Sequence, residues 1–165
     1  MPVLQKITPC LWFDNQAEEA ARFYTAIFAN SRMGAIARYG EAGQEVHGQE
    51  AGTVMTVAFE LEGQAFTALN GGPIFTFNEA ISFQVACTTQ EEVNFYWEKL
   101  SAGGDEQAQQ CGWLKDKYGV SWQIVPTLLI EMLNDPDYEK SQRVMAAMLR
   151  MKKIDIAGLR QAYAG

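Results

Sequence analysis

AEEAARFYTAIF (residues 17–28) and QEEVNFYWEKL (residues 90–100) carry the same pattern at two places in this chain. Each contains a pair of glutamates followed by a Phe-Tyr pair. Glu18 and Glu91 are 73 positions apart, and Phe23 and Phe95 are 72 positions apart. Apolar residues at spacings of three and four in both segments predict two amphipathic helices.

The residues before each segment carry a helix-start signal. Asn15 is followed three positions later by Glu18, and Thr89 is followed three positions later by Glu92. This is the spacing of a capping box, in which the first side chain accepts a hydrogen bond from the backbone of the third helical residue. We therefore expect the first helix to begin at about Gln16.

Segments rich in β-branched and aromatic residues flank both helices, which is typical of strands. Around the first helix these are LQKITPCLWF (4–13), MGAIARYG (33–40), TVMTVAFEL (53–61) and AFTALN (65–70). Around the second they are AISFQVAC (80–87), CGWLKD (111–116) and VSWQIVP (120–126). The order β-α-β-β-β is thus predicted twice, and the second copy is shortened where its first strand after the helix should be.

A duplicated module explains the repeated helix, although two ordinary amphipathic helices are an alternative explanation. The predicted organisation is a first βαβββ module (1–72), a connection with a second, shortened module (73–126), and a helical C-terminal extension (127–165). The fold class is α+β. Two small open sheets cannot each cover both faces, so we expect the modules to share a core or a cleft.

The extension has a strong apolar pattern within one predicted helix. Its members are Val144, Met145, Met148, Leu149 and Met151. They form either a core face of the chain itself or a contact with a second subunit. Because they cover more than the stripe that an ordinary surface helix needs, they favour a homodimer.

Composition excludes several classes of function. The 165 residues carry a net charge of −7 and no basic run, so no nucleic-acid partner is expected. No apolar stretch approaches the roughly 18 residues of a membrane span, and the first ten residues lack the features of a secretory signal. Three cysteines at wide spacing favour free thiols and hence the cytoplasm.

Paired βαβββ modules are the plan of the vicinal oxygen chelate superfamily, which includes glyoxalase I, extradiol dioxygenases and bleomycin-resistance proteins. The chain resembles its PhnB-like branch, the 3-demethylubiquinone-9 3-methyltransferase domain family. The resemblance spans nearly the whole chain. It lies in ITPCLWFDNQAEEAARFY (7–24), GGPIFTFNEAISFQV (71–85), GWLKDKYGVSWQIVP (112–126) and VMAAMLRMKKIDIAGLRQAY (144–163).

The resemblance implies where a metal site would lie. Metal-using members similar to glyoxalase I carry His or Glu on the first and last strand of each module. The corresponding residues here are Thr8, Ala68 or Asn70, Ser82, and Gln123. None of them is the imidazole, carboxylate or thiolate that a transition metal prefers, and the single histidine, His47, lies in a loop. We expect no tightly held metal and no cofactor.

The same strands predict a small-molecule cleft. Strand alternation places small polar groups and aromatics on one sheet face and apolar residues on the other. The predicted cleft residues are Thr8, Cys10, Trp12, Ala68, Asn70, Ser82, Gln84, Ser121 and Gln123. The alternative is that these polar groups fill a wet groove that an ancestral metal site has left.

Other candidate residues favour structural roles. Cys10 and Cys87 lie on predicted strands without a histidine to activate them, so inert thiols are expected. Asp116 is expected to shape a hairpin turn and to pair on the surface. Trp113 is expected to pack in the core or to line the mouth of the cleft.

The predicted function is binding of an unidentified small organic molecule, with or without its transformation, and without a tightly held transition metal. No catalytic residue is assigned. A metal-dependent lyase or isomerase would need ligands such as Glu60, Glu62 or His47. A sequestration protein, like the bleomycin-binding relatives, would need no catalytic group. A methyltransferase is not expected, because no glycine-rich turn joins a strand to a helix here.

Overall fold

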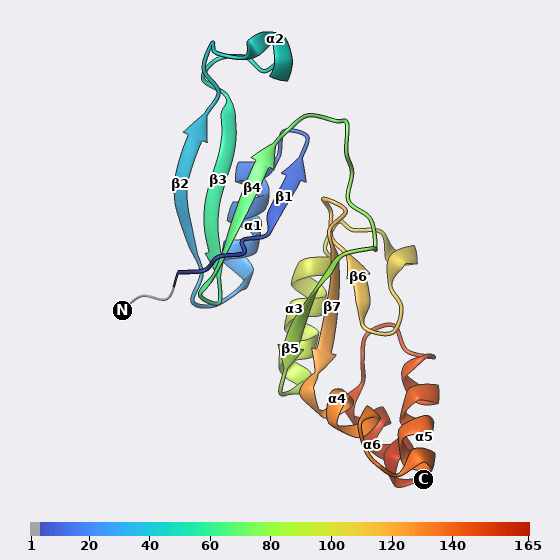
Figure 1. Ribbon diagram of the computed structural model, residues 1–165. Helices are drawn as coiled ribbons and strands as arrows, with labels where there is room; N and C mark the ends of the chain where they lie inside the picture. The colour runs from blue at the N-terminus through green and yellow to red at the C-terminus, as the bar shows by residue number, and fades with distance from the viewer. Residues whose placement is uncertain (1–3) are drawn as a thin grey trace. The chain divides into compact units, whose positions relative to one another are not determined.

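The computed structural model describes residues 4–165, which form an α+β fold with two small sheets (Figure 1). The chain divides into two compact units, of which the first ends at Thr76 and the second spans Phe77–Gly165. The second unit contains both the second module and the helical extension. The predicted fold class, paired modules with a shortened second copy, is confirmed.

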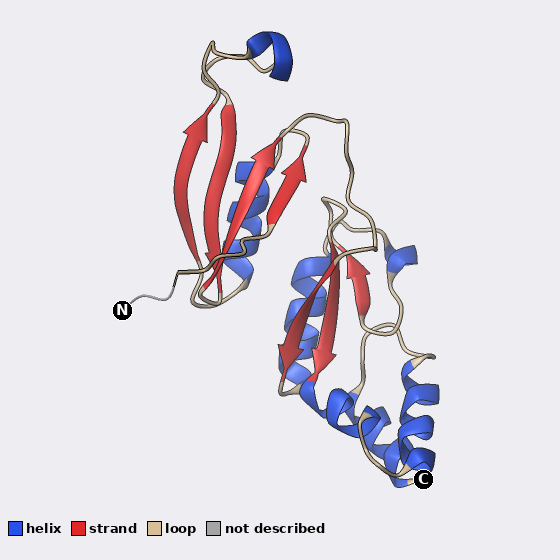
Figure 2. Ribbon diagram, viewed as in Figure 1, coloured by secondary structure: helices blue, strands red, loops and turns tan. Residues whose placement is uncertain are grey.

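The first unit is a four-stranded sheet with one long helix against it (Figure 2). Its elements are β1 (Cys10–Phe13), α1 (Ala17–Ile27), β2 (Arg32–Arg38), α2 (Gln44–His47), β3 (Val54–Leu61) and β4 (Gln64–Asn70). The strand order is β1-β4-β3-β2, with β1 parallel to β4 and the other pairs antiparallel. The sequence did not predict the single turn α2, which lies in the glycine-containing β2–β3 connection.

Helix α1 covers one face of this sheet because its apolar residues recur at helical spacing. Ala17, Ala20, Tyr24 and Ile27 are buried against the sheet. The Tyr24 ring stacks on Phe59 of β3 with the centroids 6.2 Å apart. Alternate residues of β3 and β4 complete this core.

The second unit begins with a three-stranded sheet. Its elements are β5 (Ser82–Cys87), α3 (Gln90–Ser101), the 3₁₀ turn η1 (Glu106–Ala108), β6 (Trp113–Lys115) and β7 (Ser121–Pro126). The strand order is β5-β7-β6, with β5 parallel to β7. The turn η1 and an isolated bridge between Gln110 and Trp113 stand where the first module has a strand. The predicted capping of α3 is confirmed, since Thr89 Oγ1 accepts from the Glu92 amide at 3.2 Å.

The extension forms α4 (Thr127–Leu133), α5 (Tyr138–Met148) and α6 (Ile156–Ala164), which pack around a core of their own. That core contains Leu129, Met132, Val144, Ile154 and Leu159, with Met148 and Met151 against it. Three of the five residues in the predicted apolar pattern, Val144, Met148 and Met151, therefore belong to this core and are not available to a second subunit. Helix α5 ends at Met148, so the pattern is not confined to one helix as expected, and Leu149 is 54% exposed.

The extension is joined to the second module by polar contacts. The side chain of Gln90 on α3 donates to the Ile154 carbonyl at 3.0 Å and accepts from the Ile156 amide at 2.7 Å. The Cys111 and Gly112 amides donate to the carbonyls of Met151 and Lys152, each at 2.8 Å. None of the helices in residues 4–165 has both the length and the apolar character needed to cross a membrane.

Candidate functional site

Each sheet has one face against its helix and one face turned away from it, which we call the open face. On the first sheet, β1 and β4 run in parallel, with Cys10 opposite Thr67 and Trp12 opposite Leu69. Residues directly opposite each other share a face, and faces alternate along a strand. Because Leu11 and Phe13 are buried toward α1, Cys10, Trp12 and Thr67 lie on the open face.

The register corrects two of the predicted cleft residues. Ala68 pairs with Leu11 and Asn70 pairs with Phe13, so both lie on the α1 face, at 0% and 7% exposed. Asn70 Oδ1 accepts from the Ala17 amide at 2.8 Å, and its Nδ2 donates to the Val54 carbonyl at 3.1 Å. Asn70 thus holds the start of α1 and does not face a ligand. The prediction that Ala68 and Asn70 share a face with Cys10 was wrong, because Cys10 pairs with Thr67 and the register differs by one residue.

A pocket of about 400 Å³ lies on the open face of the first sheet. Its floor is made of small residues, among them Gly34, Ala58 and Ala65, and two hydroxyls, of Thr8 and Thr67, line it. Arg32 and Glu60 also line the pocket and pair with each other at 2.8 Å. The carboxylate of Glu60 raises the pKa of Arg32, so the guanidinium stays charged. The sequence singled out Thr8, but Arg32 and Thr67 were missed.

The open face of the second sheet carries a grid of polar side chains. Ser82, Ser121 and Lys115 lie in one row across β5, β7 and β6, and Gln84, Gln123 and Trp113 lie in the next. The opposite face holds Phe83, Val85, Trp122 and Ile124, which pack toward α3 as predicted. The predicted residues Ser82, Gln84, Ser121 and Gln123 therefore share one face, and Lys115 joins them.

Hydrogen bonds order this grid. Gln123 Nε2 donates to Ser82 Oγ at 2.8 Å, and Gln84 Nε2 lies 3.4 Å from Gln123 Oε1. Lys115 Nζ lies 2.5 Å from Glu79 Oε1, and this contact lowers the pKa of Glu79. Ser121 is 2% exposed, and its Oγ has no hydrogen-bond partner among the described residues.

The two sheets carry comparable positions at their parallel strand pairs. Cys10 stands opposite Thr67 on the first sheet, as Gln84 stands opposite Gln123 on the second. Thr8 and Ser82, and likewise Cys10 and Gln84, are 74 positions apart. Thr67 is therefore the counterpart of Gln123, in place of Ala68 or Asn70. The four positions comparable to metal ligands in glyoxalase-like proteins hold Thr8, Thr67, Ser82 and Gln123.

The chemistry of these four residues does not suit a transition metal. Three hydroxyls and an amide are neutral, whereas zinc and its neighbours favour imidazole, carboxylate or thiolate. No group of three His, Cys, Asp or Glu side chains within residues 4–165 is close enough to hold a metal ion.

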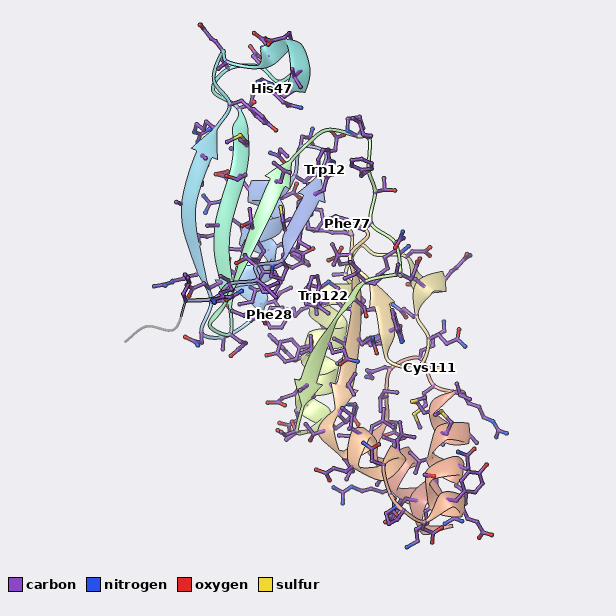
Figure 3. The ribbon with its side chains drawn as sticks, in the orientation of Figure 1. Trp12, Phe28, His47, Phe77, Cys111 and Trp122 are labelled. Carbon is purple, nitrogen blue, oxygen red and sulfur yellow. The ribbon has the colours of Figure 1, made fainter. Side chains whose placement is uncertain are left out.

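The alternative ligands named from the sequence have other surroundings. His47 Nδ1 accepts from the Gln49 amide at 2.9 Å, and its Nε2 lies 3.1 Å from the Ala42 carbonyl. Its ring lies beside Tyr39, with the centroids 4.6 Å apart (Figure 3). Glu60 pairs with Arg32, and Glu62 is exposed in the β3–β4 turn.

Cys10 and Cys87 are thiols without the lowered pKa of an activated nucleophile. Cys87 is fully buried, and desolvation with a contribution from Glu92 raises its pKa to about 11. Cys10 lies on the open face of the first sheet, and desolvation of its sulfur raises its pKa. Cys10, Cys87 and Cys111 are all free of disulfides.

Two further predicted residues have roles that the sequence left open. Trp113 lies on the open face, opposite Gln123. Trp12 (Figure 3) donates its indole N–H to the Gly72 carbonyl at 2.9 Å and meets the edge of Phe75 at 5.0 Å. A side chain at Gly71 would lie 2.2 Å from the Trp12 ring, so only glycine fits there. Trp12 thus anchors the chain that follows β4.

The chain is a member of the vicinal oxygen chelate superfamily. It has the duplicated modules of that superfamily and a helix on one face of each sheet, and Thr8, Thr67, Ser82 and Gln123 lie at comparable positions of the two sheets. The chain belongs to the family described as 3-demethylubiquinone-9 3-methyltransferase, whose sequence profile matches residues 5–125. No match was found among curated proteins.

Solved structures support this assignment. The chain is similar to a putative 3-demethylubiquinone-9 3-methyltransferase, PhnB protein, from Bacillus cereus, with 38% identity and a TM-score of 0.64 over 74% of this chain and 100% of that one. A protein from Pseudomonas aeruginosa shares 18% identity, with a TM-score of 0.58 over 74% and 98% of the two chains. The fosfomycin resistance protein FosX from Listeria monocytogenes shares 16%, with a TM-score of 0.50 over 81% and 100%. The last two show the shared fold alone.

Proposed function

We propose that this protein binds a small organic molecule on the open faces of its sheets, with or without transforming it, and without a tightly held transition metal. The observation that carries the proposal is the set of side chains at the four ligand positions of the fold. Thr8 and Thr67 on the first sheet, and Ser82 and Gln123 on the second, offer neutral hydrogen-bond donors and acceptors of the kind that small-molecule sites use. The pocket of about 400 Å³ on the first sheet has the volume for such a ligand.

Methyl transfer, which the family description names, is not part of this proposal. S-adenosylmethionine enzymes of the common type hold their cofactor on a glycine-rich turn between a strand and a helix. The turns that lead to α1 and α3 read Asp14-Asn15-Gln16 and Thr88-Thr89, without glycine. Neither turn contains the glycines that allow the backbone to approach such a cofactor closely.

A thermal-shift screen against metabolites and antibiotics tests the proposal. A ligand at 100 times its dissociation constant adds about 2.7 kcal/mol to the stability and raises the melting temperature. For the ligand that emerges, Thr67→Val or Gln123→Met should weaken binding, whereas Thr25→Val on α1, whose hydroxyl bonds within its own helix, should not. Product analysis after incubation separates catalysis from sequestration.

Metal analysis of freshly purified protein provides the opposing outcome. We expect far less than one equivalent of Zn²⁺, Ni²⁺, Mn²⁺ or Fe²⁺, and a chelator should leave the melting temperature unchanged. Stoichiometric metal that survives dialysis would instead support the metal-dependent lyase or isomerase.

The proposal also covers the oligomeric state and the cellular compartment. The protein forms a homodimer, to which exposed apolar side chains of the extension contribute; Ile130 and Leu149, 48% and 54% exposed, support this. It works in a reducing compartment such as the cytoplasm, which three cysteines without disulfides support.

A further inference from the structure

We propose that the open face of the second sheet binds a small organic carboxylate, and that Glu79 of the chain itself occupies the charged end of this site in the free protein. This inference rests on the proposed function and names its class of ligand. It is carried by one ion pair, one buried hydroxyl and the grid of polar side chains around them.

The charged end of the site is Lys115. Its ammonium group lies 2.5 Å from Glu79 Oε1, and the Lys115 side chain is 25% exposed while that of Glu79 is 60% exposed. The cation thus belongs to the sheet, and the carboxylate reaches it from the solvent side. Exposed ion pairs contribute little net stability, so another carboxylate can replace Glu79 at small cost.

Ser121 supplies a buried hydroxyl beside Lys115. It stands between Ser82 and Lys115 in the register of the sheet. Its hydroxyl is buried and has no partner among the described residues, which is unfavourable for a polar group. The second oxygen of a carboxylate bound to Lys115 would accept a hydrogen bond from this hydroxyl. The buried hydroxyl would then have a partner.

Glu79 can leave without disturbing the sheet, because it precedes β5. Phe77, two residues earlier, lies beside the turn that joins β6 to β7: a side-chain carbon placed on Gly119 would be 3.9 Å from the Phe77 Cβ. Residues 77–79 are not part of any strand. Movement of this short segment breaks the pair with Lys115 and leaves the strand pairings of β5, β6 and β7 intact.

The neighbouring row of the grid describes the rest of the ligand. Gln123 and Gln84 present amide groups beside Ser82, and Trp113 offers an aromatic surface at the edge. A flat apolar body with a carboxylate at one end matches this arrangement, in which Lys115 has the Ser121 hydroxyl opposite it and the Trp113 indole two residues away on the same strand. Sodium benzoate is therefore a suitable probe, and benzamide is its neutral counterpart.

The test is an NMR titration of the full-length, ¹⁵N-labelled protein with benzoate and with benzamide. Benzoate should shift the Ser121 amide and the Trp113 indole resonances saturably, and benzamide should do so more weakly. Glu79→Gln removes the competing carboxylate and should tighten benzoate binding about two- to fivefold, which corresponds to the loss of one exposed ion pair. Lys115→Met should abolish saturable binding.

Two controls separate this role from a structural one. Lys117→Met changes the charge by the same amount on the same hairpin, and it should leave benzoate binding unchanged. Ser121→Ala should weaken benzoate binding without destabilising the free protein, because the hydroxyl has no partner there. Equal benzoate affinity in the wild type, Glu79→Gln and Lys115→Met would overturn the inference. If the library screen still finds a ligand whose binding depends on Thr67 or Gln123, the proposed function stands without it.

Discussion

Asp116 is the residue that holds the β6–β7 hairpin together. Its Oδ1 accepts from the amides of Tyr118 and Val120, at 2.8 and 3.0 Å, and its Oδ2 accepts from the Trp122 indole at 2.9 Å. The sequence predicted the turn correctly but placed the side chain at the surface, whereas it is 2% exposed. A buried carboxylate is tolerated here because three N–H groups surround it.

Asp116→Ala should therefore destabilise the protein by about 3 kcal/mol or more, since it leaves buried donors without acceptors. Urea unfolding measures this loss. Asp105→Ala is the control, because Asp105 is exposed and accepts one bond, from the Gln107 amide; it should cost about 1 kcal/mol or less. Similar losses for the two variants would contradict the structural role assigned to Asp116.

At the scale of elements, helix α1 depends on a side chain that is distant in sequence. The predicted capping residue Asn15 is exposed, and the helix has no side-chain cap at its N-terminal boundary, Gln16. Asn70 at the end of β4 accepts the bond from the Ala17 amide instead. A local sequence motif placed the helix start correctly to within a residue, but it could not reveal a cap that comes from another strand.

Asn70→Ala should cost about 2 kcal/mol or more, because it leaves the Ala17 amide and the Val54 carbonyl unpaired. Asn15→Ala should change the free energy of unfolding by less than about 0.5 kcal/mol. Chemical denaturation of both variants provides the comparison. If Asn15→Ala lowered the free energy of unfolding more than Asn70→Ala, Asn15 would be the capping residue of α1 after all.

The same contrast limits how far the sequence could describe the site. Apolar periodicity and turn residues predicted the order and type of the elements, and the residues of β5 and β7 that face the helix were predicted correctly. The face on which the β4 residues Ala68 and Asn70 lie was predicted wrongly, because side chains alternate at every residue and a shift of one residue reverses the face. The spacing from a helix does not fix such a register, whereas the pairing of Cys10 with Thr67 does. Arg32 and Lys115 were missed because lone basic residues on strands resemble ordinary surface charges.

The second sheet offers a direct test of the ligand positions. Ser82→His together with Gln123→Glu replaces two neutral groups, now 2.8 Å apart, by an imidazole and a carboxylate. The double variant should bind Ni²⁺ or Zn²⁺ weakly but saturably in a calorimetric titration, because these are preferred ligand types. Each single variant serves as a control and should bind more weakly. A folded double variant that binds metal no better than the singles would show that the two side chains do not converge.

At the scale of the whole molecule, the proposed dimer can be tested at the extension. Val144 is fully buried, and Met148 packs on the same core, so Met148→Glu should lower the melting temperature. Leu149→Glu changes an exposed side chain, and it should shift the protein toward monomer in sedimentation velocity while leaving the melting temperature of the monomer nearly unchanged. A wild type that is already monomeric at tens of micromolar would remove the dimer from the proposal.

The extension should also show a characteristic pH dependence. The Tyr163 hydroxyl donates to Asp135 Oδ2 at 2.5 Å, which lowers the pKa of Asp135 and raises the pKa of Tyr163. The carboxylate contributes stability above its unfolded pKa, and this is lost as the pH falls through the folded value. The phenol contributes below its unfolded pKa, and this is lost as the pH rises through the folded value.

The melting-temperature difference between the wild type and Tyr163→Phe should consequently be largest between about pH 5 and pH 9 and should shrink on both sides. Tyr138→Phe is the matched control, since Tyr138 is 73% exposed, and it should show no such profile. A difference that stays constant from acid to alkaline pH would mean that the Asp135 contact does not stabilise the extension.

The bonds from Cys111 and Gly112 to Met151 and Lys152, together with those of Gln90, have a consequence for synthesis on the ribosome. The first unit ends at Thr76, so its strands and α1 can assemble while the rest of the chain is still being translated. The second unit cannot form the contacts between its sheet module and the extension until residue 156 has left the exit tunnel. Translation of the residues between Thr76 and residue 156 takes roughly 4–16 s at about 5–20 residues per second. During that interval the second module lacks the contacts with the extension that join the two in the finished protein.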